Sequence, residues 1–112
     1  MEGIKIVDLQ DAEIDEGHGV VTRRIIRAAE GAESMSFGFS TLPEGTHDPA
    51  ACYPDHDEIF HILTGRVEIT IAGEPHVLEP GKTIFVPRGE TYGYKVLEGP
   101  NDVVVAFAPA RY

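Results

Sequence analysis

The sequence predicts an all-β fold, built as a sandwich or barrel of short strands. Hydrophobic residues alternate with polar or small ones over residues 34–40 and again over residues 66–72, which is typical of strands with one buried face. Turns rich in glycine and proline separate these segments from their neighbours. A length of 112 residues, of which 42% are hydrophobic and 25% charged, suits one domain with one core.

The other elements follow from the same patterns, taken in chain order. Further strands are expected over residues 4–9, 20–27, 58–63, 76–78, 83–86, 91–97 and 102–108. Turn residues stand between most of them, at 64–65, 72–74, 79–81, 87–89 and 98–101. Residues 8–16 could support a short helix, although they present no continuous apolar face. Eight or more short strands at this spacing predict two packed sheets or a closed barrel.

The charge balance argues against two classes of partner. The chain has 9 Lys and Arg residues against 19 Asp and Glu residues, so its net charge is −10 with neutral histidines. Such a surface repels phosphate backbones and anionic lipid headgroups. We therefore expect no nucleic acid and no membrane among its partners.

Cysteine usage and the apolar runs predict a cytoplasmic protein. Cys52 is the only cysteine, so no disulfide can form within the chain. Residues 1–16 are acidic and lack the apolar stretch of a signal peptide. The longest wholly apolar run, residues 103–110, is too short to cross a bilayer.

Two segments are apolar on both faces, which bears on assembly. In residues 58–63 each face carries hydrophobic side chains, and in residues 102–108 both faces are apolar. A strand of this kind needs a core on one side and a second layer or another subunit on the other. We therefore expect a homodimer.

Two motifs in the second half of the chain resemble the signature of the cupin superfamily. In the first cupin motif a glycine, a glutamate and a second glycine have the spacing found here for Gly45, Glu58 and Gly65. The second cupin motif places a glycine, a proline and a glycine as they occur in GKTIFVPRGETY, residues 81–92. The resemblance extends over most of the chain and implies a jelly-roll β-barrel.

The same resemblance implies a division of the chain. One cupin domain would span residues 1–112, with N-terminal strands in residues 1–33 and the motif-bearing barrel in residues 34–108. The stretch 57–65 is also similar to cupins of the ethanolamine-utilisation type, which keep the glutamate and lose histidines.

The departures from the cupin motifs bear on cofactors. Cupins with a metal centre hold a divalent ion with two histidines and the glutamate of the first motif and the histidine of the second. Here Ala51, Tyr53 and Tyr92 stand where those histidines would be, and only Glu58 is retained. The resemblance therefore implies no cofactor, since one carboxylate with two phenols is a poor metal site. An atypical divalent metal at Glu58 with His56 or His47 stays open as an alternative.

Three residues are the candidates for catalysis. Glu58 shares a strand face with Phe60, and we expect it to point into the barrel, where burial would raise its pKa toward neutrality. His56 has the same parity as Glu58 and could exchange protons with it if the loop turns inward. Tyr92, in the second motif, is expected to face Glu58 and to donate a hydrogen bond to a developing oxyanion.

A second group of residues is expected to bind the substrate. Tyr53 and Tyr94 would present hydroxyls to the cavity, and Phe60 would form its wall. His47 follows a turn and could lie at the mouth of the barrel. Arg24, if it points inward, could hold a carboxylate substrate through two hydrogen bonds.

These residues support function hypotheses from different classes. The first is a metal-independent acid–base enzyme, a lyase, isomerase, dehydratase or cyclase, that acts on a small polar organic substrate. The alternative is a non-catalytic module that binds a ligand or a partner with a degenerate site. A third is a metal-dependent cupin enzyme with atypical ligands. The fold alone does not decide among them.

Overall fold

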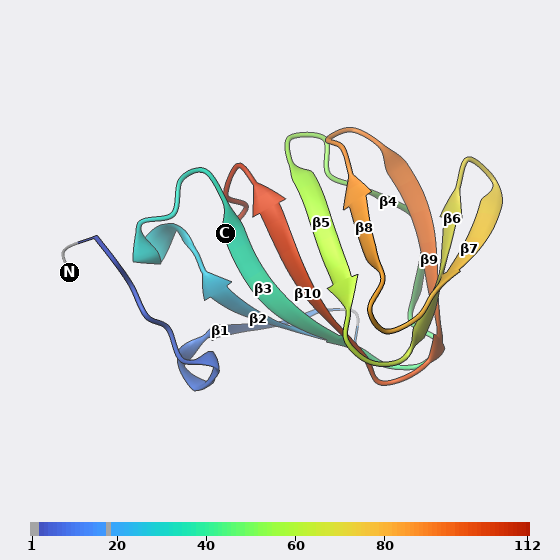
Figure 1. Cartoon of the computed structure of the whole chain (residues 1–112), viewed down its shortest axis with the longest axis horizontal. Coiled ribbons are helices and arrows are strands. Elements are labelled where there is room, and N and C mark those ends of the chain that lie inside the picture. The colour runs from blue at the N-terminus through green and yellow to red at the C-terminus, as the bar shows by residue number, and fades with distance from the viewer. Residues whose placement is uncertain (1–2, 18) are drawn as a thin grey trace.

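The computed structural model describes residues 3–17 and 19–112, which form two antiparallel β-sheets (Figure 1). The six-stranded sheet has the order β1–β2–β3–β10–β5–β8, and the four-stranded sheet has the order β4–β9–β6–β7. Together they make the predicted jelly roll. The strands of the first sheet are β1 (Glu13–Gly17), β2 (Val20–Ile26), β3 (Ser36–Leu42), β10 (Asn101–Ala108), β5 (Asp57–Ile62) and β8 (Thr83–Val86). Those of the second are β4 (His47–Cys52), β9 (Thr91–Glu98), β6 (Arg66–Ile71) and β7 (Glu74–Leu78).

Alternating side chains place the core between the sheets. Along β10 every second side chain is buried, and Val105 pairs in register with the buried Phe60 of β5. On the opposite sheet, Ile69 of β6 and Val96 of β9 are almost completely buried. Burying such aliphatic side chains stabilises the fold by about 1.5–3 kcal/mol each. The period-2 pattern of the sequence thus sets which residues can face a cavity between the sheets.

One glycine of the first motif is required by a close backbone approach. Gly65 has φ +77°, and a Cβ atom there would lie 2.5 Å from the Glu98 carbonyl oxygen and 2.8 Å from that of Pro100. Any other residue would therefore displace the turn between β9 and β10. This contact positions the start of β6 next to the end of β9.

The N-terminal part of the chain differs from the sequence-based expectation. Residues 4–9 form no strand, since residues 4–8 have no regular structure and pair with no neighbouring strand. The side chain of Ile6 is 86% exposed. The short helix considered for residues 8–16 is also wrong. That stretch forms a single 3-10 turn, η1 (Leu9–Asp11), and then β1, an edge strand whose residues are all exposed. A second 3-10 turn, η2 (Ala28–Glu30), precedes β3.

Strand β4 was missed by the sequence analysis. It contains Pro49 and a register shift between Asp48 and Ala51, and its side chains show no burial alternation. Proline is tolerated there because β4 is an edge strand, which needs ladder hydrogen bonds on one side only. Strand β4 matters for the site because it leads directly to Tyr53.

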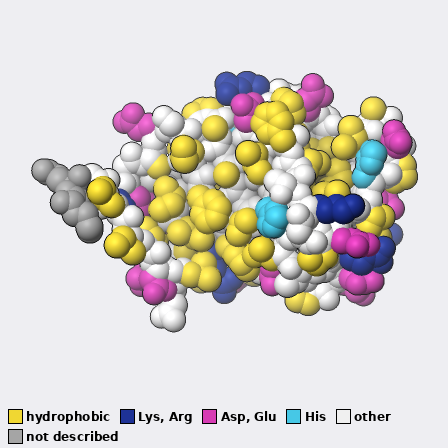
Figure 2. Space-filling model, viewed as in Figure 1, with side chains coloured by type: hydrophobic (Ala, Val, Ile, Leu, Met, Phe, Trp, Pro, Cys, Tyr) yellow, Lys and Arg dark blue, Asp and Glu magenta, His cyan; other side chains and the backbone are white. Residues whose placement is uncertain are grey.

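The outer face of the six-stranded sheet carries exposed hydrophobic side chains. Phe37, Ile59 and Phe85 are 37%, 46% and 60% exposed, and Ala106 of β10 pairs with both Ile59 and Phe37. Figure 2 shows hydrophobic side chains gathered over β3, β10 and β5 on the face toward the viewer. Within the described residues, no helix is long and apolar enough to cross a membrane.

Candidate active site

A cavity of about 160 Å³ lies between the two sheets. Phe60, Val67, Ile69 and Val105 give it apolar walls, and Glu58 and Arg111 are its ionisable groups other than phenols. All 4 tyrosines of the chain line it: Tyr53, Tyr92, Tyr94 and Tyr112. An apolar cavity of about 150 Å³ holds benzene. The space therefore suits a small organic molecule of about that size.

Glu58 and Tyr92 meet across the cavity from opposite sheets. Glu58, on β5, is 5% exposed, and the Tyr92 hydroxyl, on β9, donates a hydrogen bond of 2.9 Å to its Oε1 atom. The expectation that these two side chains face each other inside the barrel is confirmed. We call this pair the floor of the cavity.

Burial controls the ionisation of the floor. It raises the pKa of Glu58 to about 7, although the hydrogen bond from Tyr92 and the positive charge of Arg111 both act to lower it. Burial, followed by the proximity of Glu58, also raises the pKa of Tyr92 far above the ordinary phenol value. The carboxyl group therefore exchanges its proton near neutral pH, while Tyr92 stays a neutral phenol.

Three of the predicted binding residues, Phe60, Tyr53 and Tyr94, also border the cavity. Phe60 packs beside Tyr92, with their ring centroids 6.0 Å apart. The ring centroids of Tyr94 and Tyr92 are 6.5 Å apart. Tyr53 meets the ring of Phe107 edge-on at 4.8 Å. Burial raises the pKa of both Tyr53 and Tyr94, so their hydroxyls are hydrogen-bond donors throughout the neutral range.

The structure does not bring the two candidate histidines to Glu58. The Nδ1 atom of His56 lies 2.9 Å from the carbonyl oxygen of Pro109, and its ring packs edge-on against Phe107 outside the cavity lining. His47 is exposed, with its Nδ1 atom 3.2 Å from the carbonyl oxygen of Gly45. It lies beside Lys95 and Glu68 on the other side of the four-stranded sheet. The loop at Pro54 breaks the strand parity on which the placement of His56 depended.

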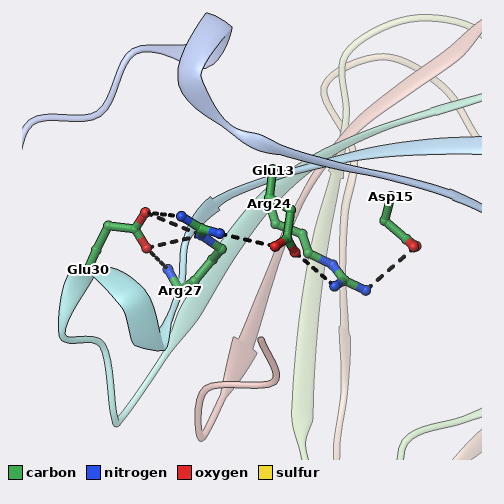
Figure 3. A network of polar contacts seen from close by, with 5 residues as sticks. All are labelled: Glu13, Asp15, Arg24, Arg27 and Glu30. Atoms are coloured by element: carbon green, nitrogen blue, oxygen red, sulfur yellow. Dashed lines mark hydrogen bonds and ion pairs between the residues drawn. The ribbon is translucent and has the colours of Figure 1, made fainter.

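Arg24 is engaged by acidic side chains of β1 (Figure 3). Its guanidinium lies 3.1 Å from Glu13 and 3.6 Å from Asp15, and it also stacks over the ring of Tyr112 at 4.9 Å. Arg27 continues the network to Glu13 and Glu30. Arg24 does not line the cavity, so it is not placed to hold a carboxylate there.

Sequence reasoning missed Arg111 and Tyr112, which border the cavity beyond the end of β10. The Arg111 guanidinium lies 4.8 Å from the ring centroid of Tyr53 and 5.2 Å from that of Phe107. Its backbone N–H donates to the hydroxyl of Ser36 at 3.0 Å. We call Tyr53, Arg111 and Tyr112 the rim. Arg111 and Tyr112 lie outside the period-2 patterns and the cupin motifs. A basic residue after a strand does not by itself indicate a binding site.

A sequence profile described as a cupin domain matches residues 38–107. The chain belongs to the cupin family. The match includes Glu58 and Tyr92 of the floor but ends before Arg111 of the rim.

Two relatives of this cupin share part of its sequence. An uncharacterized protein of Streptomyces coelicolor is 29% identical over 76 residues, which cover 68% of this chain and 71% of the relative. The pectin degradation protein KdgF of Dickeya dadantii is 30% identical over 56 residues, covering 50% of this chain and 51% of KdgF.

Solved cupin structures share the fold at lower sequence identity. KdgF from a Halomonas species superposes with a TM-score of 0.82 at 18% identity, covering 96% of both chains. Ectoine synthase from P. lautus gives 0.82 at 21% identity, covering 95% of this chain and 78% of that one. An ethanolamine utilization protein Q of Salmonella typhimurium gives 0.74 at 22% identity over 97% of this chain and 89% of that one. At these identities the similarity shows the fold alone.

The residues of this cupin do not fit the metal centre of the family. Within the described part of the chain, no group of three or more His, Cys, Asp and Glu side chains could hold a metal ion. In the cavity the donors are Glu58 and phenols, and burial raises the pKa values of those phenols, which makes metal-binding phenolates harder to form. His56 and His47, the atypical ligands considered above, lie outside the cavity lining. A divalent ion prefers imidazole, thiolate or several carboxylates.

Proposed function

We propose that this cupin is a metal-independent acid–base enzyme that moves a proton on a small polar organic substrate, with Glu58 as the proton-transfer residue. One observation carries the proposal: a carboxyl group with a pKa of about 7 points into a small apolar cavity, where a substrate can reach it. A buried carboxyl group of this kind costs stability in the absence of a ligand, which favours a functional role.

In the proposed chemistry one carboxyl group, that of Glu58, first accepts a proton from the substrate and then returns it. The Glu58 carboxylate takes a proton from a carbon or hydroxyl of the substrate and becomes a carboxylic acid. It then returns the proton to a different atom, as in an isomerase or cyclase, or to a departing hydroxyl, as in a lyase or dehydratase. The proton count of the enzyme is unchanged after either cycle.

Tyrosine hydroxyls would stabilise the negative charge that develops on the substrate. Tyr92 has one O–H group, which in this structure is donated to Glu58, so Tyr92 would act by turning to the substrate when Glu58 is protonated. Tyr53 and Tyr94 line the same cavity and offer further donors for a substrate oxygen. KdgF and ectoine synthase share the fold, and their names refer to pectin degradation and to ectoine synthesis, which is compatible with an enzymatic role.

Hydrogen–deuterium exchange tests proton abstraction before the substrate is known. The protein would be incubated in D₂O with a panel of small oxo acids, hydroxy acids and ketones, and loss of carbon-bound hydrogen would be followed by ¹H NMR. We expect exchange in at least one compound with the unaltered protein and about 10²–10⁴-fold slower exchange with Glu58→Gln. Equal exchange in both proteins would overturn the role of Glu58.

The alternative function is a module that binds a ligand without turnover. The hydrogen bond from Tyr92 favours it, because this bond satisfies Glu58 within the protein. A ligand that binds in the cavity but shows neither exchange nor conversion would support this alternative over the enzyme.

We also propose a homodimer in the cytoplasm. The exposed hydrophobic side chains of Phe37, Ile59 and Phe85 support the dimer, because a second copy would remove them from water. Light scattering over a concentration series should then give about twice the 12.2 kDa of one chain. A constant mass of one chain at all concentrations would contradict the dimer.

A further inference from the structure

The rim of the cavity contains an arginine whose position is fixed by stacking. The Arg111 guanidinium lies over Tyr53 at 4.8 Å and over Phe107 at 5.2 Å, and these two rings pack against each other edge-on at 4.8 Å. The backbone of Arg111 is tied to Ser36 through a 3.0 Å hydrogen bond. Stacking orders a guanidinium while leaving its N–H groups free to donate.

Arg111 forms no ion pair within the described part of the protein, although its charge acts on Glu58 across the cavity. The ion pairs formed there engage Arg24, Arg27, Arg66 and Arg88, and none includes Arg111. Arg24, in contrast, has two carboxylates within reach, Glu13 and Asp15. Among the basic side chains of the described residues, Arg111 is the one that lines the cavity, so it places a positive charge there in a chain whose net charge is −10. A planar guanidinium donates two parallel hydrogen bonds to a carboxylate.

We propose that the cavity takes a small organic monocarboxylate, whose carboxylate pairs with Arg111 at the rim and whose apolar or carbonyl-bearing body lies over Glu58. The volume of about 160 Å³ and the walls formed by Phe60, Val67, Ile69 and Val105 suit a body the size of a six-membered ring. In its catalytic sense this inference rests on the proposed function, since Glu58 would then act on the atoms next to the carboxylate. Binding itself requires no turnover.

Glu58 gives this binding a pH signature. The titratable and charged groups around Glu58 are Tyr92 and Tyr94 of β9 and the rim residues Tyr53, Arg111 and Tyr112. Burial raises the pKa of each of these phenols, so they stay neutral near pH 7, and Glu58 is the acidic group of this set that changes charge there. A bound carboxylate is repelled by ionised Glu58, so its affinity should fall as the pH rises through about 7.

Three probes with the same ring separate the ligand classes. Benzoate, benzyl alcohol and benzylamine carry a negative, a neutral and a positive group, and their binding would be measured by calorimetry and by protein-observed NMR. We expect benzoate to bind at least about ten times more tightly than the alcohol and the amine, and several-fold more weakly at pH 8 than at pH 6. In Glu58→Gln the pH dependence should disappear, and the binding should remain.

Arginine variants test the assigned partner. Arg111→Gln should reduce benzoate affinity about tenfold or more and leave that of benzyl alcohol unchanged, and Arg111→Lys should restore part of the loss through its charge. Arg66→Gln, on the surface beside Glu79 and Glu98, is the matched control and should bind benzoate normally. Circular dichroism and a melting curve show whether each variant folds.

The outcomes distinguish this inference from the proposed function. Tightest binding of benzylamine, unchanged benzoate affinity in Arg111→Gln, or no binding of any probe would overturn the monocarboxylate inference. If Glu58-dependent exchange on neutral ketones persists in any of these cases, the proposed acid–base function stands without it. If benzoate binds through Arg111 but no compound exchanges hydrogen, the monocarboxylate site stands and the enzyme proposal fails.

Discussion

The floor and the rim of the cavity are built in different ways. Glu58 and Tyr92 of the floor stand on central strands of opposite sheets, and each is less than 10% exposed. Tyr53, Arg111 and Tyr112 of the rim lie outside the strands and are held by stacked rings and one backbone hydrogen bond. Strand register fixes the floor, so it suits proton transfer, which requires a set geometry. The rim residues lie in connecting segments, where binding residues are commonly found, so the rim suits the choice of ligand.

The largest effect is expected when the ionisable group of the floor, Glu58, is replaced by a neutral side chain. Glu58→Gln should reduce turnover by about 10²–10⁴-fold, because the amide keeps the shape of the side chain but cannot transfer the proton. The measurement is kcat on the substrate found by the exchange screen. Glu68→Gln, half-buried on the other face of the four-stranded sheet, is the matched control and should keep its rate. Full turnover in Glu58→Gln would move the proton-transfer role to another residue.

The floor should also make stability depend on pH. In the folded protein the pKa of Glu58 is raised to about 7 from 4.5, so between these values the folded state holds a proton that the unfolded state has released. Stability contributed by protonated Glu58 is therefore present below about pH 4.5 and lost as the pH rises through 7. The loss should be on the order of 3 kcal/mol between pH 4.5 and 8.

Urea unfolding at several pH values measures this effect as a difference between two proteins. Glu58→Gln has no such proton, so it should be more stable than the unaltered protein at pH 8 and similar to it at pH 5. Parallel pH curves for the two proteins would show that Glu58 titrates normally, and the acid–base proposal would lose its main support.

A smaller effect is expected for the other half of the floor. Tyr92→Phe should slow turnover by roughly 10–10³-fold, because one oriented hydroxyl is lost. The variant also removes a hydrogen bond that lowers the pKa of Glu58, so the pKa seen in the pH profile of kcat/KM should rise above about 7. An unchanged profile would mean that the Tyr92 hydroxyl does not act on the ionisation of Glu58.

The smallest effect should come from the arginine that is engaged outside the cavity. Arg24→Gln breaks half-exposed ion pairs with Glu13 and Asp15, so it should cost about 1 kcal/mol or less of unfolding free energy. Benzoate affinity should change by less than about twofold, in contrast with Arg111→Gln. A loss of affinity in Arg24→Gln as large as in Arg111→Gln would mean that the rim extends to β2.

The sequence predicted the floor because its residues lie where pattern and motif agree. Glu58 has the parity of Phe60 on a strand, and Tyr92 occupies the position of a motif histidine, so strand period and motif spacing both direct them inward. The direction of the Glu58 pKa shift followed as well, since burial outweighs a single phenol hydrogen bond.

Arg111 and Tyr112 of the rim, and strand β1, could not be predicted in the same way. Arg111 reaches the cavity because the chain turns back after β10 to Ser36, a contact between residues far apart in sequence. Strand β1 is formed by the polar run EIDEG, which pairs with β2 and whose acids bind Arg24, so no apolar alternation marks it. Residues 4–8 have the alternation but no partner strand. A period-2 pattern shows which face of a segment is apolar. Whether the segment forms a strand also depends on a neighbouring strand that pairs with it, which the pattern does not show.

The gathering of every tyrosine around one cavity gives the protein a built-in optical reporter. The chain has 4 tyrosines and no tryptophan, so its intrinsic ultraviolet fluorescence comes almost entirely from side chains that line the cavity. A molecule that enters the cavity touches these emitters directly, and one that binds to the outer surface does not. The Tyr92 hydroxyl donates a hydrogen bond to Glu58, and an ionised carboxylate in this position quenches phenol fluorescence. The emission of Tyr92 should therefore decrease as the pH rises through about 7 and Glu58 ionises. Ligand entry and proton release are thus both visible in the unlabelled protein.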